Sequence, residues 1–336
     1  MNLSNFIEVT FPRIEQQIEL MINLSHQMHD LSLSKMLRYH LGLSTDKDHQ
    51  LNQGKKIRPL LLLLTTETSG GNWEKSIPAA AAVEMIHNFS LIHDDIEDQS
   101  EFRRGRLTLW KKYSLPLAIN AGDALFALAF VCIGELCNNH SMEISFQSYQ
   151  LLSEACIMLT KGQHLDISYE TLESVNLNGY LEMIEGKTAA LLAISSRIGA
   201  LIAGADSHKH QQYYEFGKNL GIAFQIIDDI LGIWGNPDKT GKSAATDLLT
   251  RKKTFPIIYG LSRDDQFREM WKNNISPDNV HVLANQLKEN GSYDIAAKKA
   301  EDFSSAALTA LHQANPEGPY GEVLVELVNL LINRTF

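Results

Sequence analysis

Apolar residues recur at three- and four-residue spacing along almost the whole chain, and no stretch of strict alternation is convincing. This spacing places apolar side chains on one face of an α-helix, whereas a half-buried strand needs a spacing of two. Glycine (21) and proline (9) are sparse for 336 residues, which disfavours many short strands and turns. The pattern therefore predicts an all-α protein. The expected helices cover residues 8–42, 55–68, 78–98, 117–138, 143–168, 177–204, 209–234, 253–262, 278–290, 294–314 and 319–333.

No linker of low complexity divides the chain, so one domain over residues 1–336 is the simplest interpretation. A net charge of −10 argues against non-specific nucleic-acid binding as the main task. The N-terminus lacks a cationic start followed by an apolar run, and apolar runs such as Pro59–Leu64 fall far short of the ~18 residues of a membrane span. We therefore expect a cytoplasmic protein without a membrane span. Its three cysteines (Cys132, Cys137 and Cys156) are interpreted as reduced core residues.

Two of the predicted helices are apolar along most of their length and then end in acidic residues. The first runs over Ala79–His93 and continues into the acidic segment 94–98, and the second runs over Leu220–Ile227 and continues into Asp228 and Asp229. A helix that is apolar on most sides is buried among other helices. Both acidic segments are therefore expected to emerge from a core.

The placement of these acids conflicts with helix stability. Asp94 and Asp98 are four residues apart, so their carboxylates share one helix face and repel each other by about a few tenths of a kcal/mol. They also stand at the C-terminal end of the helix, where the helix dipole disfavours anions. Such conflicts tend to mark functional sites, and a hard divalent cation, Mg²⁺ above all, would remove this one. The alternative for a single cluster is a solvated acidic turn.

Basic segments follow both acidic ones, and others begin or interrupt helices. Acid clusters with separated Lys and Arg groups suit diphosphates that are held jointly by metal ions and charge-assisted hydrogen bonds. Read singly, such basic runs are usually solvated faces. Gly186-Lys187-Thr188 is similar to the end of a nucleotide-binding P-loop, but no glycine-rich segment or strand precedes it, so we discard the nucleotide interpretation. The basic segments are 55–58, 103–106, 239–242 and 251–253.

Together these segments resemble the trans-polyprenyl diphosphate synthases, the family of farnesyl, geranylgeranyl and longer-chain diphosphate synthases. The resemblance covers at least residues 54–260 and rests on seven motifs in the family's order and spacing, each weak alone. The motifs are GKKIRP (54–59), LIHDDIED (91–98) with RRG (103–105), GQHLD (162–166), GKT (186–188), FQIIDD (224–229), GNPDKTGK (235–242) and RKKT (251–254).

The resemblance implies a helical bundle around a deep central cavity, and a homodimer. It implies a head-to-tail 1′-4 condensation of isopentenyl diphosphate with an allylic diphosphate, which is dimethylallyl, geranyl or farnesyl diphosphate. It also implies about three Mg²⁺ per active site with substrate bound, with Mn²⁺ as a substitute. The allylic C–O bond ionises, the isopentenyl double bond attacks the cation, and a proton is then lost, with water excluded.

The family pattern also implies a role for each matching residue. Metal ligands and their supports would be Asp94, Asp98, Asp228, Asp229 and Asp166, with Gln163 beside the last. Cations on the leaving diphosphate would be Arg103, Lys187, Lys242 and Lys252. The isopentenyl diphosphate would be held by Lys55, Arg58, His87 and Arg104. Thr188 and Gln225 would face the allylic carbon. Independently, His87 precedes Asp94 by seven residues and so shares its helix face, although a lone histidine on an apolar helix is usually a core residue.

Gly232 departs from the family pattern, in which the second aspartate motif usually ends in an acid four residues after its first Asp. The missing acid is expected to weaken the support of the third Mg²⁺. From the sequence alone, Gly232→Asp is expected to lower the Mg²⁺ concentration that activity requires.

The resemblance also suggests a product. The residue five before the first aspartate often forms the floor of the family's product pocket, and here it is Phe89, followed by the small Ser90. This pairing is similar to that of geranylgeranyl diphosphate synthases.

The alternatives are that Phe89 is ordinary core packing, that the product is farnesyl or longer, that the chain is a class I terpene cyclase, or that it is a silent partner subunit. The cyclase has no use for an isopentenyl site and its usual second metal motif is absent, whereas silent subunits typically lose an aspartate motif.

Overall fold

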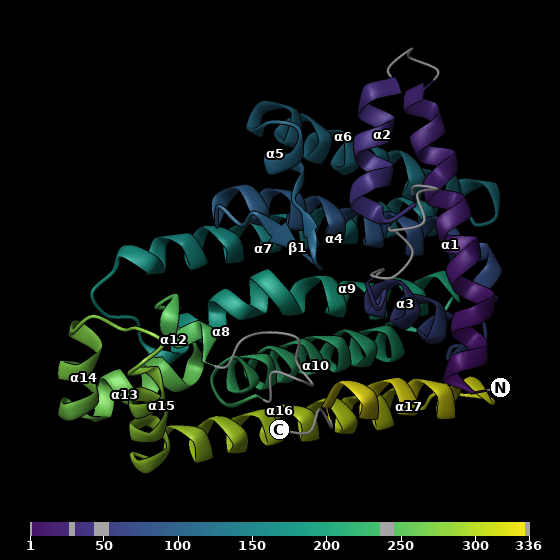
Figure 1. The fold of residues 1–336 in the computed structure, drawn as a ribbon. Helices are drawn as coiled ribbons and strands as arrows, with labels where there is room; N and C mark the ends of the chain where they lie inside the picture. Colours follow the sequence, from purple (N-terminus) through teal and green to yellow (C-terminus); the bar gives the residue numbers. More distant parts are fainter. Residues whose placement is uncertain (1, 27–30, 44–53, 236–244, 333–336) are drawn as a thin grey trace. The chain divides into compact units, whose positions relative to one another are not determined.

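The computed structural model describes residues 2–26, 31–43, 54–235 and 245–332, and these are almost entirely helical (Figure 1). The all-α prediction is confirmed, and within the described ranges the only sheet is a two-stranded hairpin. The elements, in chain order, are α1 Leu3–His26, α2 Leu31–Leu41, α3 Ile57–Thr68, η2 Trp73–Ser76, α4 Ile77–Glu97, β1 Phe102–Arg103, β2 Arg106–Leu107, α5 Leu109–Lys112, α6 Leu115–Gly134, η3 Glu135–Asn138, α7 Met142–Thr171, α8 Leu177–Ile184, η4 Glu185–Ala189, α9 Ala190–Ile202, α10 Ser207–Trp234, α12 Thr246–Leu249, α13 Phe255–Arg263, α14 Asp265–Lys272, α15 Val280–Glu289, α16 Ser292–Ala314 and α17 Tyr320–Ile332.

The chain divides into two compact units. The first comprises Met1–Glu154, Ile194–His210 and Pro316–Leu324, and the second comprises Ala155–Ala193, Gln211–Asn315 and Val325–Phe336. Each contains one of the two acidic segments. The single-domain organisation stays a prediction.

Helix α4 is the buried centre of the first unit and packs against α6, α3 and α1. Pro78 stands in its first turn, where a missing backbone N–H costs nothing, and four alanines follow, the strongest helix formers. Every residue from Ile77 to Ile86 is buried. The first acidic segment is therefore the exposed end of a buried helix, as predicted.

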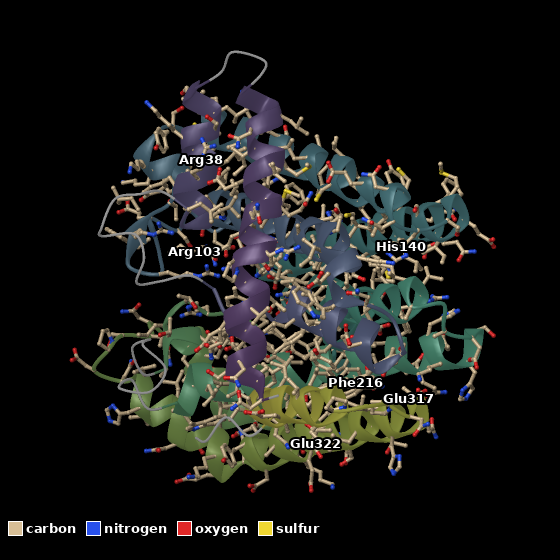
Figure 2. The ribbon with its side chains drawn as sticks, turned by 90° about the vertical axis from the view of Figure 1, so that its right-hand side faces the viewer. Arg38, Arg103, His140, Phe216, Glu317 and Glu322 are labelled. Atoms are coloured by element: carbon tan, nitrogen blue, oxygen red, sulfur yellow. The ribbon has the colours of Figure 1, made fainter. Side chains whose placement is uncertain are left out.

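The two N-terminal helices are connected by an ion pair. Arg38 of α2 binds Glu19 of α1, with its Nε 3.0 Å from Oε2 (Figure 2).

The hairpin of β1 and β2 follows the first acidic segment directly. Phe102 pairs with Leu107 and Arg103 with Arg106, which leaves Arg104 and Gly105 as a two-residue turn. Both turn residues have positive φ (52° and 75°), as a type I′ turn requires, and a glycine suits that conformation. This tight turn fixes the directions of the arginines beside it.

The second unit is built on α10. Its Ile222, Ile226 and Ile230 recur at four-residue spacing and pack against Tyr180 of α8 and Phe255 of α13. A second apolar cluster surrounds Ile233, near the end of α10, with residues of α12, α13, α14 and α15. These clusters fix the segment that carries the second pair of aspartates.

The continuous segment Leu115–Asn138 is long and apolar enough to cross a membrane by length and composition, with a mean hydropathy of 1.9. A search for long uninterrupted apolar runs does not find this segment, because Asp123 and Glu135 interrupt an otherwise apolar sequence. Only 39% of its most apolar window is buried, and core helices pass the same test. It is weak evidence for a membrane span.

Two of the three cysteines match the prediction. Cys132 and Cys156 are buried, whereas Cys137 is exposed, and all three are free. The prediction of a core position was wrong for Cys137, because it stands near the end of η3, where the helix leaves the core.

Candidate active site

The first acidic segment forms the last turn of α4. Asp94 is partly exposed, Asp98 is exposed at the C-cap, and the Asp98 backbone N–H donates to the Asp94 carbonyl at 2.8 Å. The helical conformation thus keeps both predicted metal ligands on one face. Two carboxylates one turn apart, open to solvent, can bind a cation that keeps several of its waters.

Asp95, between these two, turns inward and was not predicted as a site residue. It is 2% exposed, and its Oδ1 accepts a hydrogen bond from Arg103 Nε at 2.7 Å. Burial raises the pKa of Asp95 to about 6, while the Arg103 charge opposes that rise. Arg103, labelled in Figure 2, is thereby fixed beside the turn that carries Asp94 and Asp98.

Three of the residues predicted to hold isopentenyl diphosphate lie within electrostatic range of one another. Burial lowers the pKa of Arg58 to about 10, and burial with the charges of Arg58 and Arg104 lowers the pKa of His87 well below its usual value. His87 is therefore neutral near pH 7. Buried Glu84 faces the same cations, and burial raises its pKa although they oppose the rise. Asn88 donates to the Glu84 carboxylate at 2.9 Å. A cluster of this kind suits a diphosphate anion.

Lys55, the fourth residue that was predicted to hold isopentenyl diphosphate, is exposed. The residues before and after it, Gly54 and Lys56, contact other parts of the unit. Lys56 is buried with a φ of 43°, and its Nζ lies 2.8 Å from Glu15 of α1. On the other side, a Cβ on Gly54 would stand 2.5 Å from a guanidinium nitrogen of Arg104. This segment therefore lies directly against the Arg104 guanidinium, which would have to move if position 54 carried a side chain.

A small hollow opens beside the hairpin arginines. Its walls include His40 of α2, whose pKa falls to about 3 because of burial and the neighbouring arginine charges. Arg106 donates to the backbone carbonyls of Tyr39 and His40 at 3.1 and 3.4 Å. The end of α2 thus holds the hairpin in place. The hollow is lined by Tyr39, His40, Asn88, Leu91, Asp95, Arg103, Arg104, Arg106, Leu107 and Thr108.

Phe89 begins a continuous series of aromatic contacts. Its ring centroid lies 4.9 Å from that of Phe126 on α6, Phe126 lies 5.0 Å from Phe130, and Phe130 lies 5.1 Å from Tyr149 on α7. On the other side, Phe89 lies 4.8 Å from the ring of His93. None of these rings is fully buried. Partial exposure distinguishes them from the packed core of the unit.

In the second unit, Asp229 is a structural anchor. It is 3% exposed, and it accepts hydrogen bonds from the Tyr180 hydroxyl, from Gln225 Nε2 at 3.0 Å and from the Phe255 backbone N–H at 3.0 Å. Burial raises its pKa to about 7, and the Tyr180 and Phe255 hydrogen bonds oppose that rise. Three donors already occupy its carboxylate oxygens, so these contacts do not support metal binding by Asp229. Its predicted role as a metal ligand stays a prediction.

Gln225 connects Asp229 to Thr188, another residue that was predicted to belong to the site. Its Oε1 accepts a hydrogen bond from Thr188 Oγ1 at 2.8 Å, so Asp229, Gln225 and Thr188 form one chain of hydrogen bonds. The sequence predicted that Thr188 and Gln225 face the same reacting atom. The structure brings these two side chains together.

Lys187 and Asp166 also meet, with Nζ 2.5 Å from Oδ2. The two segments that carry them cross with almost no gap, because a Cβ on Gly162 would stand 2.0 Å from the Lys187 backbone nitrogen, and a Cβ on Gly186 would stand 2.6 Å from the Met158 carbonyl oxygen. The glycines of both motifs are therefore needed to bring this ion pair together. A short π-helical turn, η4, carries Lys187 into that position.

The remaining predicted residues differ in position. Asp228 is partly exposed on α10, one residue before the buried anchor, and Lys252 is exposed but close enough for its charge to lower the pKa of Asp229. Lys242 lies outside the described residues. Within the described ranges, no three His, Cys, Asp or Glu side chains gather closely enough to hold a metal ion by themselves. A Mg²⁺ ion here would need further oxygen ligands, such as water and substrate phosphates.

The polyprenyl synthetase family matches residues 43–289 of the chain. The chain belongs to this family. It is a prenyltransferase that extends prenyl diphosphates head to tail, and the match extends beyond the motifs of residues 54–260 at both ends.

Relatives with different product lengths are similar to this polyprenyl synthetase. It is 39% identical to the (2E,6E)-farnesyl diphosphate synthase of Mycobacterium tuberculosis, over 97% of this chain and 93% of the relative. It is 36% identical to the geranylgeranyl diphosphate synthase of Sulfolobus acidocaldarius (84% and 87%) and 38% identical to the geranylfarnesyl diphosphate synthase of Aeropyrum pernix (83% and 89%). These relatives do not agree on one product.

Solved structures agree on the fold. A polyprenyl synthetase from Streptomyces coelicolor superposes with a TM-score of 0.87 at 32% identity, with 98% of each chain covered. A polyprenyl synthase from Caulobacter crescentus, complexed with calcium and isoprenyl diphosphate, superposes with a TM-score of 0.84 at 28% identity, covering 99% of this chain and 97% of that one. The isoprenoid-synthase type of fold is thereby confirmed.

Sequence reasoning missed three residues that the structure connects to the predicted ones. Asp95 and Tyr180 hold Arg103 and Asp229, and Asp247 of α12 lies beside Gly232. Asp95 lies inside the LIHDDIED motif, so the sequence could have identified it as a site residue. The contacts of Tyr180 and Asp247 join segments distant in sequence, which apolar periodicity does not reveal.

Proposed function

We propose that this polyprenyl synthetase makes geranylgeranyl diphosphate by Mg²⁺-dependent condensation of isopentenyl diphosphate with an allylic diphosphate. The observation that carries the proposal is the aromatic series that begins at Phe89, five residues before Asp94. A bulky, partly exposed ring at this position suits a stop for a growing hydrocarbon chain. Farnesyl and longer products are the alternatives, and the named relatives include both.

The carboxylates of the first unit are proposed to bind metal together with the allylic diphosphate. Asp94 and Asp98 supply oxygen ligands from one helix face, and bound Mg²⁺ would stabilise negative charge on the departing diphosphate. Asp95 does not bind metal in this proposal but holds Arg103, whose guanidinium donates to the same anion.

The cluster around Glu84 is proposed to hold isopentenyl diphosphate. Arg58 and Arg104 supply charge, Lys55 adds an exposed ammonium group, and neutral His87 donates one N–H. The buried Glu84 carboxylate reduces the mutual repulsion of these cations. This division gives the two substrates separate binding groups.

In the second unit, Asp228 is proposed to bind a further Mg²⁺, while Lys187, Lys252 and Lys242 neutralise the diphosphate as it leaves. Asp166 holds the Lys187 ammonium group in place. The Thr188 hydroxyl oxygen and its Gln225 partner face the allylic carbon, where their dipoles stabilise developing positive charge. The released diphosphate can accept the proton, so the protein need not supply a base.

The test is product analysis with purified protein, isopentenyl diphosphate and each of the three allylic primers. We expect geranylgeranyl products with Mg²⁺ or Mn²⁺ and none in excess EDTA, because the described carboxylates need the ion to bind the anionic substrate. Chromatography of the hydrolysed products reads the result. Full turnover in EDTA contradicts the metal mechanism, cyclic hydrocarbons would indicate a cyclase, and no product would indicate a silent subunit.

We further propose a cytoplasmic homodimer. Large apolar side chains remain exposed on α6 and at the start of α7, including Val131 (51%), Met142 (72%) and Phe146 (58%). Several large apolar side chains exposed on neighbouring segments of the chain are typical of an interface. A second copy of the chain would cover them.

Sedimentation equilibrium should therefore give twice the mass of one chain. Charged substitutions at Val131 and Phe146 should shift the protein toward monomer, whereas the same substitution at Val282, which is 47% exposed on α15, should not. A monomeric parent protein would refute the dimer.

A further inference from the structure

Gly232 stands where the family pattern of the sequence analysis has the last acid of the second aspartate motif. It is buried inside the 28-residue helix α10, although glycine in a helix interior costs about 1 kcal/mol relative to alanine. It is four residues after Asp228, so both lie on the same helix face, one turn apart. The glycine therefore calls for a local explanation.

The explanation is a carboxylate that occupies the space beside it. A Cβ built on Gly232 would stand 2.1 Å from Oδ2, 2.6 Å from Cγ and 3.1 Å from Oδ1 of Asp247. No side chain fits at position 232 unless the Asp247 carboxylate moves. The missing side chain of the motif is thus replaced, in space, by an acid from a different helix.

Local packing keeps Asp247 in this place. The adjacent Leu248 is completely buried in the same apolar cluster as Ile233, which follows Gly232 on α10. After the short helix, the Lys252 backbone N–H donates to the Asp247 carbonyl at 2.9 Å. These contacts attach α12 to α10 beside the glycine and leave the Asp247 side chain partly exposed.

The charge of Asp247 also reaches the neighbouring site residues. It raises the pKa of both Asp229 and Tyr180, in addition to the effect of burial. The Asp247 carboxylate is therefore in electrostatic contact with the residues around Asp228.

We propose that Asp247 is a positioning residue that takes the place of the missing acid, supporting the Mg²⁺ ion and the diphosphate bound near Asp228. The inference rests on the proposed function. It replaces the expectation that Gly232→Asp lowers the Mg²⁺ requirement: a second carboxylate at position 232 would displace Asp247 and repel it, so that variant should gain nothing.

The test uses the full chain and two measurements. Calorimetry measures the affinity for inorganic diphosphate in the presence of Mg²⁺, and condensation assays measure the Mg²⁺ concentration at half-maximal rate. Asp247→Asn removes the charge at constant shape, and Gly232→Ala displaces the carboxylate without removing it. Each should weaken diphosphate binding and raise the Mg²⁺ requirement by about tenfold. Asp265→Asn, a 91% exposed acid on α14, is the matched control and should match the parent.

The decisive variant exchanges the two positions. Gly232→Asp combined with Asp247→Ala returns an acid to the motif and makes room for it, so both readouts should come back to within about twofold of the parent. Circular dichroism confirms folding of every variant. Parent-like binding by Asp247→Asn, or an exchange variant no better than Asp247→Ala alone, overturns the inference. A parent protein without Mg²⁺-dependent diphosphate binding would instead refute the proposed function.

Discussion

Replacing Asp94 by asparagine or alanine should reduce turnover by at least about 10²–10³-fold while the fold persists. The reason is that its carboxylate is proposed to bind the metal, whereas its negative charge opposes the end of the helix. Asp94 lies in the last turn of α4, one turn before Asp98, where the helix dipole and the neighbouring acid both disfavour negative charge. Losing that charge should therefore leave the melting temperature unchanged or raise it slightly.

Two measurements on the same samples check this expectation. Turnover is followed at saturating Mg²⁺, and thermal unfolding is followed without metal, so that lost metal binding does not affect the comparison. Glu8→Gln, an exposed acid on α1, is the control and should change neither quantity. A large loss of stability in Asp94→Asn without metal would show that the carboxylate supports the fold, against the argument above.

The helical framework was predictable from the sequence because buried helices impose a spacing of three and four on apolar residues. The alanine-rich start of α4 and the isoleucines of α10 follow that rule directly. The same rule fails where an element is too short for a period. The hairpin has two-residue strands and α12 has four residues, so neither was predicted.

Helix boundaries were less predictable than the helices themselves. The predicted helix 8–42 ends at His26 and a separate helix begins at Leu31. Helix α14 was not predicted, although Asp264 caps it by accepting a hydrogen bond from the Phe267 backbone N–H at 3.1 Å. An acid just before a helical segment is a usable signal, but it becomes clear only when the following turn is known to be helical.

In the candidate site, the motifs identified which residues to examine but not how they pair. Lys187 and Asp166 are 21 residues apart, and Tyr180 and Asp229 are 49 apart. Such contacts depend on how closely two helices approach, which Gly162 and Gly186 permit in one case. A glycine inside a helix is therefore a sequence signal for a close neighbour, and at Gly232 that signal was available but did not identify Asp247.

The aromatic series that begins at Phe89 leads to the second large expectation, a change of product. Phe89→Ala should lengthen the product by one or more five-carbon units, because it removes the ring that is proposed to stop the growing chain first. The Phe126 ring, 4.9 Å away on α6, would then be the next obstacle. The double variant Phe89→Ala with Phe126→Ala should lengthen the product further, whereas Phe126→Ala alone should leave it unchanged while Phe89 remains.

The order of these effects separates a pocket floor from ordinary packing. If Phe89 only packs the core, its loss should cost ~3–5 kcal/mol of stability and leave the product as it was. Phe303→Ala serves as the control, because that ring is also partly buried but packs in the second unit. Chromatography of the hydrolysed products from folded protein reads the chain length. A folded Phe89→Ala variant with the parent's product profile removes Phe89 from the site. Longer products from Phe126→Ala alone would place the first stop at Phe126 instead.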